Sequence, residues 1–179
     1  RITEAEAIAK GDALIAALIE AARDWAESFQ NRAYVTQTWR VSMSAFPADR
    51  YIELPKPPLQ SLVSLSYWDG TALQVVSFID PSGTTLFETD DYLVDIASQP
   101  GRLCLKPGAS WPAIESRANA VQVEYVAGFG LAADVPERVK AAIKLRVSEM
   151  YEGRGDQPAV DGYKSAAEQL LWTDRIVPV

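Results

Sequence analysis

The stretch from Asp12 to Phe29, DALIAALIEAARDWAESF, decides the fold of this chain. Its apolar residues recur at steps of three and four, which is typical of a helix with one apolar stripe: Leu14, Ile15, Leu18, Ile19, Ala22, Trp25, Ala26 and Phe29. Each large side chain contributes roughly 1.5–3 kcal/mol when it is fully covered. We therefore expect another element of the chain to cover this stripe.

Two other parts of the sequence can supply that cover. Short predicted strands extend from about Val35 to Ala127, and a second amphipathic helix follows Pro136. No helix-length segment with a period of 3.6 lies between the strands to form the crossovers of a parallel sheet, so the pattern argues against a parallel α/β sheet. We predict an α+β fold, in which a small bundle of N- and C-terminal helices carries an inserted antiparallel β-sheet or sandwich-like unit. Within one composite domain, the predicted parts are residues 1–34, 35–127 and 128–179.

Capping signals predict where the N-terminal helices begin and end. Thr3 and Glu6 have the spacing of a capping box, which favours a short helix over residues 4–10 that ends at Gly11. Asp12 would then cap the long helix.

The C-terminal part returns to the helical period. Asp134 and Glu137 repeat the capping-box spacing and predict a helix over residues 136–152 that ends near Gly153. Its predicted inward face comprises Val139, Ala142, Ile143, Val147 and Met150. Residues 155–161 are predicted to be a loop. A shorter helix over residues 163–172 follows, with Ala166, Leu170 and Leu171 facing inward.

The middle of the chain alternates with a period of two, which is typical of half-buried strands. Residues 36–45 form the first predicted strand, and segments rich in Pro, Gly and Asp separate the later ones. The inward-facing residues are predicted to be Trp39, Val41, Met43 and Ala45; Ile52 and Leu54; Val63, Leu65 and Tyr67; Tyr92, Val94 and Ile96; Leu103 and Leu105; and Val121, Val123 and Tyr125.

Composition argues against an enzyme or a metal protein. The chain of 179 residues has a formal net charge of −7, no histidine and one cysteine, Cys104. It therefore lacks the usual general base near neutral pH and the commonest transition-metal ligand, and it cannot form an internal disulfide. We expect no catalysis, metal or cofactor. A net acidic chain is also poorly suited to gripping nucleic acid. No apolar run is long enough for a membrane span, so we expect a soluble protein.

Two motifs that suggest chemistry have simpler interpretations. Residues 128–133, GFGLAA, match the letters of a dinucleotide-binding fingerprint. In that motif, however, the helix begins within the glycines, whereas Pro136 places the helix start later here. We interpret the segment as a loop. The segment 55–58, PKPP, resembles an SH3-type ligand but is interpreted as a stiff connector between strands.

Acidic residues and the cysteine offer two further candidates. Asp90 and Asp91 are neighbours on a predicted strand entry and would point to opposite faces, so they are poorly placed to share an ion with each other or with Asp95. Arg102 and Lys106 flank Cys104 and would favour its thiolate. Without a histidine base, we interpret Cys104 as a small structural residue.

The chain as a whole resembles the head-tail connector (adaptor) family of long-tailed bacteriophages and prophages. Four segments carry the resemblance: TEAEAIAKGDALIAALIEAARDWAESFQNRAYVTQTW (3–39), LPKPPLQSLVSLSYWDG (54–70), GRLCLKPGASWP (101–112) and VQVEYVAGFGLAADVPERVKAAIKLRVSEMYEGRG (121–155). Their order and spacing, more than any one of them, make the match specific.

The resemblance implies a non-enzymatic virion protein. In this reading it forms a homo-oligomeric ring, dodecameric in the particle, under the portal protein ring at the head-tail junction, and it contacts head-completion (stopper) or tail proteins. Genomic DNA would pass through the channel without specific binding, and assembly would take place in the host cytoplasm. The helices would form the ring body, and the β region would project from it.

The C-terminal segment 170–179, LLWTDRIVPV, is predicted to dock on the portal because it is too apolar for a tail left in water. The candidate contact residues are Leu171, Trp172, Arg175, Ile176 and Val177. The alternative for this segment is that it folds back over its own helices. For the protein as a whole, the alternatives are a β-rich binding module of a tail or baseplate, and an enzyme that uses carboxylates alone.

Overall fold

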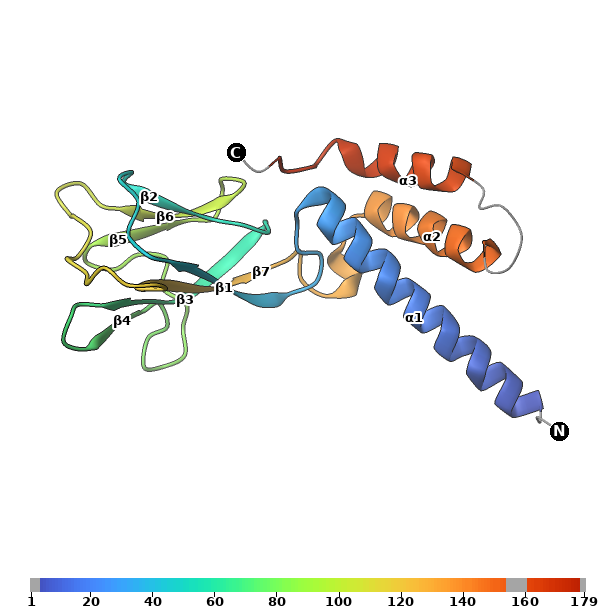
Figure 1. Ribbon diagram of the computed structural model, residues 1–179, viewed down its shortest axis with the longest axis horizontal. Helices are drawn as coiled ribbons and strands as arrows, with labels where there is room; N and C mark the ends of the chain where they lie inside the picture. The colour runs from blue at the N-terminus through green and yellow to red at the C-terminus, as the bar shows by residue number, and fades with distance from the viewer. Residues whose placement is uncertain (1–3, 154–160, 178–179) are drawn as a thin grey trace. The chain divides into compact units, whose positions relative to one another are not determined.

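The computed structural model describes residues 4–153 and 161–177, with side chains from Gly11 onward except that of Asp161. The described chain divides into two compact units. A helical unit is built from the two ends of the sequence, up to Asn31 and from Asp134, and a β unit comprises residues 32–133. The predicted α+β fold is confirmed. Figure 1 shows the helices and the sheets, which are described here unit by unit.

Three α-helices form the described part of the helical unit. They are α1 (Glu4–Gln30), α2 (Glu137–Glu152) and α3 (Asp161–Trp172), and a 3₁₀ turn, η1 (Ala132–Asp134), precedes α2. The predicted packing of α1 on α2 is confirmed, and α3 packs mainly on α2. Small buried side chains let the helices approach closely, namely Ala22, Ala26, Ala142 and Ala167, and the larger Val139 and Leu171 are also buried.

The predicted break at Gly11 is wrong, because α1 is one continuous helix of 27 residues. A glycine inside a helix costs roughly 1 kcal/mol relative to alanine. The flanking residues, rich in Ala, Leu, Ile and Glu, have strong helix propensity and offset that cost. Asp12 consequently lies inside the helix and does not cap it.

Two further predictions for the helices are wrong in detail. Helix α2 has Pro136 at its N-cap position and no side-chain capping hydrogen bond, so the Asp134 capping box does not form. In α3 the buried residues are Ala167 and Leu171, which are one turn apart, whereas Leu170 faces outward. Helix α3 is short and has two adjacent leucines, Leu170 and Leu171, so its sequence did not indicate which of the two is buried.

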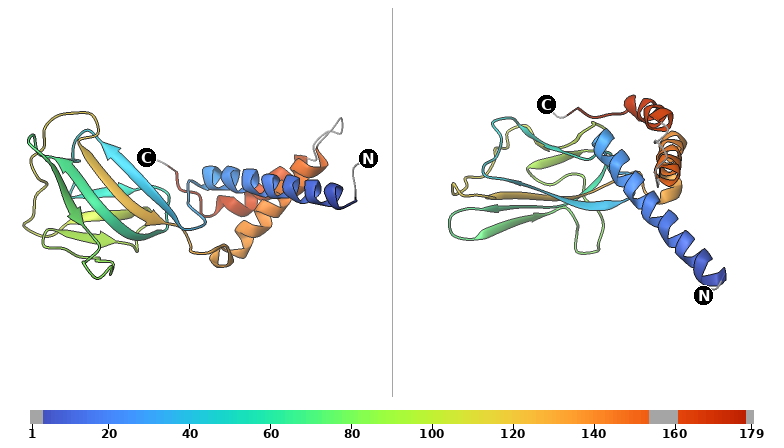
Figure 2. Two further views of the ribbon diagram at one scale, coloured as in Figure 1. Left: turned by 90° about the horizontal axis from the view of Figure 1, so that it is seen from below. Right: turned by 45° about the vertical axis from the view of Figure 1, so that its right-hand side comes forward.

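The β unit contains two antiparallel sheets in its described residues. One sheet has the strand order β1-β7-β3-β4 and the other β2-β6-β5. Figures 1 and 2 show them as two layers. The strands are β1 (Gln37–Met43), β2 (Tyr51–Leu54), β3 (Leu59–Trp68), β4 (Leu73–Ser77), β5 (Tyr92–Asp95), β6 (Gly101–Leu105) and β7 (Val121–Ala127).

The inner faces of the two sheets enclose one hydrophobic core. Ile52, Leu54, Val94, Leu103 and Leu105 come from the three-stranded sheet, and Leu62, Leu65, Val121, Val123 and Tyr125 come from the four-stranded sheet. Tyr125 donates a hydrogen bond from its hydroxyl to the Pro55 carbonyl at 2.7 Å, and burial raises the pKa of this phenol. The predicted inward residues of β2, β6 and β7 are therefore confirmed.

Strand β3 departs from the predicted alternation. Its buried residues are Leu59, Leu62 and Leu65, at a spacing of three, because the register against β7 shifts twice. Each shift is a β-bulge that adds one residue to β3, first Gln60 and then Val63. A bulge moves the following side chains to the other face, so Val63 is not the core residue that the alternation predicted.

Two other strand predictions need correction. Ile96 is exposed because β5 ends at Asp95, whose carboxylate accepts hydrogen bonds from the Ala97 and Ser98 amides and starts a turn. Strand β4 was not predicted. Asp69 folds the chain back into it by accepting hydrogen bonds from Thr71 and Ala72, and these bonds lower the pKa of Asp69 well below its usual value.

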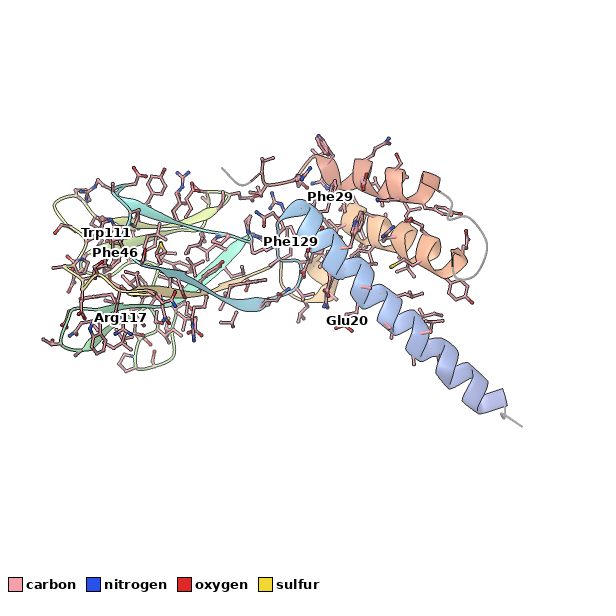
Figure 3. All side chains as sticks on the ribbon, in the orientation of Figure 1. Glu20, Phe29, Phe46, Trp111, Arg117 and Phe129 are labelled. Atoms are coloured by element: carbon pink, nitrogen blue, oxygen red, sulfur yellow. The ribbon has the colours of Figure 1, made fainter. Side chains whose placement is uncertain are left out.

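Trp111 is partly buried and packs against the core of the β unit. Its ring stacks on Phe46 at 4.8 Å between centroids and also faces Tyr92, and its Nε1 donates to the Asp49 carbonyl. Figure 3 shows Phe46 and Trp111 side by side. Burial raises the pKa of Tyr92 to about 12. Trp111 therefore contributes to the hydrophobic packing of the β unit, although the sequence around it is rich in turn residues.

The two ends of the β unit are held side by side by backbone hydrogen bonds. The Phe129 amide donates to the Tyr34 carbonyl at 2.9 Å, and the Thr36 amide donates to the Gly130 carbonyl at 2.9 Å. Gln60 is the extra residue of the first bulge, and its side-chain Nε2 donates to the Gly128 carbonyl at 2.7 Å. We call residues 33–36 and 128–130 the clamp. The GFGLAA segment is thus a loop, as predicted.

The clamp requires a glycine at position 128. Gly128 has φ +129°, and a Cβ there would overlap the Val35 carbonyl. We predict that Gly128→Ala lowers the free energy of unfolding of the β unit by about 3 kcal/mol or more, from strain and overlap together. Gly83→Ala is the control, because Gly83 also has positive φ but open space around it, and about 1 kcal/mol is expected. Urea unfolding measures both, and equal losses would contradict the overlap argument.

An ion pair within α2 lies at the contact between α1 and α2. Glu149 is buried in the helical unit and accepts a hydrogen bond from Arg146 Nη1 at 2.6 Å. The Arg146 guanidinium lies 5.1 Å from the centre of the Trp25 ring. Glu149 was not among the predicted inward residues of α2, and its ion pair with Arg146 compensates the cost of burying its charge.

We predict that Glu149→Gln destabilises the helical unit by about 1.5–3 kcal/mol, because Arg146 keeps its partly buried charge without a counter-charge. The matched control is Glu152→Gln, on the exposed end of the same helix, for which a change within about 0.5 kcal/mol is expected. Thermal unfolding followed by circular dichroism checks both. A similar shift for the two variants would rule out a role for the ion pair.

Candidate functional site

Potential metal-ligating side chains do not cluster among the described residues. Residues 4–153 and 161–177 hold no group of three or more His, Cys, Asp or Glu side chains that could bind a metal ion. Asp90 and Asp91 are exposed directly before β5, as predicted. Asp95 instead binds its own turn, and the Ser98 hydroxyl and amide are the main causes that lower its pKa. The carboxylates therefore do not converge in one cleft.

Cys104 is half-buried in β6. Burial and the nearby Asp95 raise the pKa of its thiol, and Arg102 only partly opposes them. The flanking cations therefore do not activate it, which supports the interpretation as a small structural side chain. The described helices include none that is long and apolar enough to cross a membrane. Exposed surfaces are the remaining candidates for a functional site in the described residues.

The C-terminal segment folds back over its own helices, as far as the structure describes it. Gln30, at the end of α1, is buried, and its Nε2 donates to the Leu171 carbonyl at 2.6 Å. The Gln30 carbonyl accepts a hydrogen bond from the Ile176 amide at 2.9 Å. Asp174 forms an ion pair with Arg138 of α2. Gln30 therefore holds both ends of residues 171–176, one through its side chain and the other through its backbone carbonyl.

The five predicted contact residues of this segment divide into two groups. Leu171 is fully buried within its own subunit, and Ile176 is half-buried. Trp172 and Val177 are 65% and 72% exposed. The exposed Arg175 guanidinium lies over the rings of Phe29 and Trp172, at 4.9 and 5.4 Å from their centres, which stiffens the surface that Trp172 presents. Residues 178 and 179 lie outside the described residues.

The first half of the α1 stripe is a second apolar surface. Leu14, Ile15 and Ile19 are 40%, 41% and 49% exposed, and Leu18 is half-buried. The expectation that another element of the chain covers the whole stripe is therefore wrong. Figure 1 and the right-hand view of Figure 2 show the N-terminal half of α1 extending beyond α2 and α3. We call Leu14, Ile15, Leu18 and Ile19 the N-terminal stripe.

A third surface lies on the outer face of the four-stranded sheet. Leu73 and Val75 are exposed on β4, an edge strand whose residues 73–77 carry no charge. A shallow depression of about 240 Å³ lies beside Leu73, and Trp68 and Arg117 also line it. The Arg117 guanidinium lies 5.0 Å from the centre of the Trp68 ring. Sequence reasoning missed this surface, although the alternation of Leu73 and Val75 was a usable signal.

Comparisons with known proteins rest on structure alone. No protein-family model and no curated protein matches the chain. Among solved structures, a chain in the neck of an empty gene transfer agent (GTA) particle computed with C6 symmetry is 20% identical, with a TM-score of 0.70, and the match covers 94% of this chain and 80% of that one.

Two further structures give similar values. A chain in the virion of the native GTA particle is 21% identical with a TM-score of 0.69, over 94% of this chain and 79% of that one. A chain in the neck of the native particle computed with C12 symmetry is 22% identical with a TM-score of 0.67, over 93% and 84%. The chain therefore shares its fold with chains of GTA particles.

Proposed function

We propose that the chain is a structural protein of the head-tail junction of a phage-like particle, where it forms a ring under the portal, extends the DNA channel and joins the head to the tail. The observation that carries this proposal is the fold shared with chains of GTA particle necks. The match covers 94% of this chain for the neck computed with C6 symmetry and 93% for the neck computed with C12 symmetry. That symmetry favours twelve copies here. No enzymatic activity is proposed.

The charge of the chain suits a conduit for DNA. A net charge of −7 repels phosphates, so a ring of such subunits lets DNA slide without specific binding. In this proposal the partners are the portal ring on one side and head-completion (stopper) or tail proteins on the other. The protein is assembled in the host cytoplasm and remains in the virion.

Electron microscopy of the full chain with its cognate portal protein tests the proposal. We expect a closed ring that is coaxial with the portal. Because each subunit in a ring needs two different complementary faces, the contacts should run head-to-tail. An isologous dimer that persists in the particle, or no association with the portal, would overturn the proposal.

A β-rich binding module of a tail or baseplate is the second candidate. The depression beside Trp68 favours it, because an aromatic ring next to a guanidinium is a common recognition surface. Binding of the isolated protein to a glycan or a receptor would support this candidate over the ring.

For portal docking, we propose Trp172 and Val177 as the direct contacts. Arg175 and Ile176 position the segment, and the buried Leu171 anchors it to the subunit. This assignment follows the exposure of the five side chains and the hydrogen bonds of Gln30. A large exposed aromatic side chain beside an arginine has the composition of an interface hot spot.

We predict that Trp172→Ser combined with Val177→Ser weakens binding to portal-containing heads at least about thirtyfold, the effect of losing roughly 2 kcal/mol at a hot spot. The subunit should stay folded, because both side chains are largely exposed. Thr173→Ala, at an exposed site in the same segment, is the control. Co-sedimentation with heads and thermal unfolding measure the two effects. Normal binding by the variant, or a loss of subunit stability with normal binding of the folded fraction, would contradict the docking surface.

A further inference from the structure

The N-terminal stripe lacks a cover because α1 is longer than the helices beside it. A helix rises about 1.5 Å per residue, so the 27 residues of α1 span about 40 Å and the 16 residues of α2 about 24 Å. Helix α3 has 12 residues and is shorter still. The covered part of α1 lies toward its C-terminal end, where Ala22 and Ala26 are fully buried. The stripe continues past that cover without changing its apolar character.

A helix half of this kind is expected to have a partner. Isolated helices of a few turns are marginal in water, and most helical stability comes from packing an apolar face. Four large apolar side chains on one side are typical of a helix that packs against a partner and not of a helix surrounded by water. Their opposite side carries residues suited to water, with Glu20 and the small Ala13 and Ala16 all exposed. The apolar side of this helix half is therefore suited to docking of a partner.

A complementary surface lies on α2 of the same unit. Ala141, Lys144, Ser148 and Tyr151 recur at steps of three and four on the side of α2 opposite the buried Val139 and Ala142. We call these four residues the outer α2 face. Ala141, Lys144 and Tyr151 are exposed. Two small side chains permit close approach of another helix, and the Tyr151 ring adds apolar area.

The N-terminal stripe and the outer α2 face each carry an exposed charged residue, and the two charges are opposite. Asp12 lies three residues before Ile15 and seven before Ile19, so it lies along one edge of the N-terminal stripe, and it is exposed. Lys144 lies on the outer α2 face, and among the described residues no acidic side chain forms an ion pair with it within 4 Å. The exposed Glu137, two turns earlier on the same side of α2, is paired with Lys140. Opposite charges on the two surfaces favour the correct partner and orient it.

We propose that the N-terminal stripe of one subunit packs on the outer α2 face of the next copy of this chain. The inference rests on the proposed ring and names the contact that closes it. Stripe and face are different surfaces of one helical unit, so the contact is head-to-tail and repeats from subunit to subunit. Each copy uses its own stripe on one neighbour and offers its own α2 face to the other.

The size of the two surfaces explains how assembly is controlled. A specific, stable interface covers about 800 Å² on each partner, which four partly exposed side chains do not reach. The isolated protein is therefore expected to be monomeric. On the portal, neighbouring copies are held at high local concentration, so a weak contact is sufficient to complete the ring.

Paired variants test the contact. Ile15→Glu places a charge on the stripe, and Ala13→Glu places the same charge two residues away on the opposite, exposed side of α1. We expect both full-length variants to keep the helical content and melting temperature of the parent protein. Rings on portal-containing heads should fall at least tenfold for Ile15→Glu and remain normal for Ala13→Glu. Equal behaviour of the two variants would overturn the proposal.

Cross-linking identifies the partner. In a Cys104→Ser background, one tagged copy carries Ile19→Cys and a second, differently tagged copy carries Ala141→Cys. Mixed on the portal and oxidised, they should form disulfides between unlike tags, and Ala13→Cys in place of Ile19→Cys should form none. Cross-links of Ile19→Cys to itself, or to the portal, would overturn the proposal.

The outcomes separate this inference from the proposed function. If Ile15→Glu rings form normally on the portal, the stripe is not the contact and the ring function stands. If the unmodified chain forms no ring with the portal, both fall.

Discussion

Two backbone hydrogen bonds, from Phe129 to Tyr34 and from Thr36 to Gly130, are the constraint on which the rest of the structure depends. They bring the two ends of a unit of about a hundred residues together. Without them, α1 and α2 would be joined through a long and variable span. Gly128 permits the close approach of the two segments, and Gln60, turned toward them by a bulge in β3, adds a side-chain hydrogen bond.

The helical unit depends on a different balance. Its contacts use alanines on α1, α2 and α3, which allow close packing but bury little area per residue. The Arg146–Glu149 pair beneath Trp25 and the buried Gln30 supply the specificity that small side chains lack. Because α2 and α3 are also shorter than α1, the first half of the α1 stripe stays exposed.

Periodicity predicted the elements well because one face of each is buried against a single partner. It placed α1, α2 and six of the seven described strands within a few residues. It failed where a local or tertiary contact overrides the period. The examples are the bulges at Gln60 and Val63, the turn at Asp95 and the burial of Glu149. The candidate surfaces were harder to predict, since the pattern of an apolar stripe is the same whether its cover comes from this chain or from another. Only the lengths of α1 and α2, seen together, separate the two cases.

The clamp also bears on the order in which the chain folds. Closing a flexible loop costs about (3/2)RT ln n, so bringing α1 and α2 together across about a hundred unfolded residues costs roughly 3 kcal/mol more than across the few residues that remain once the clamp has formed. The β unit contains its own core and its own clamp, and needs no helix to complete either. Folding of the β unit is therefore expected to precede the docking of α1 on α2. Once the β unit has folded, the chain segments that lead to α1 and α2 lie close together, although they are about a hundred residues apart in the sequence.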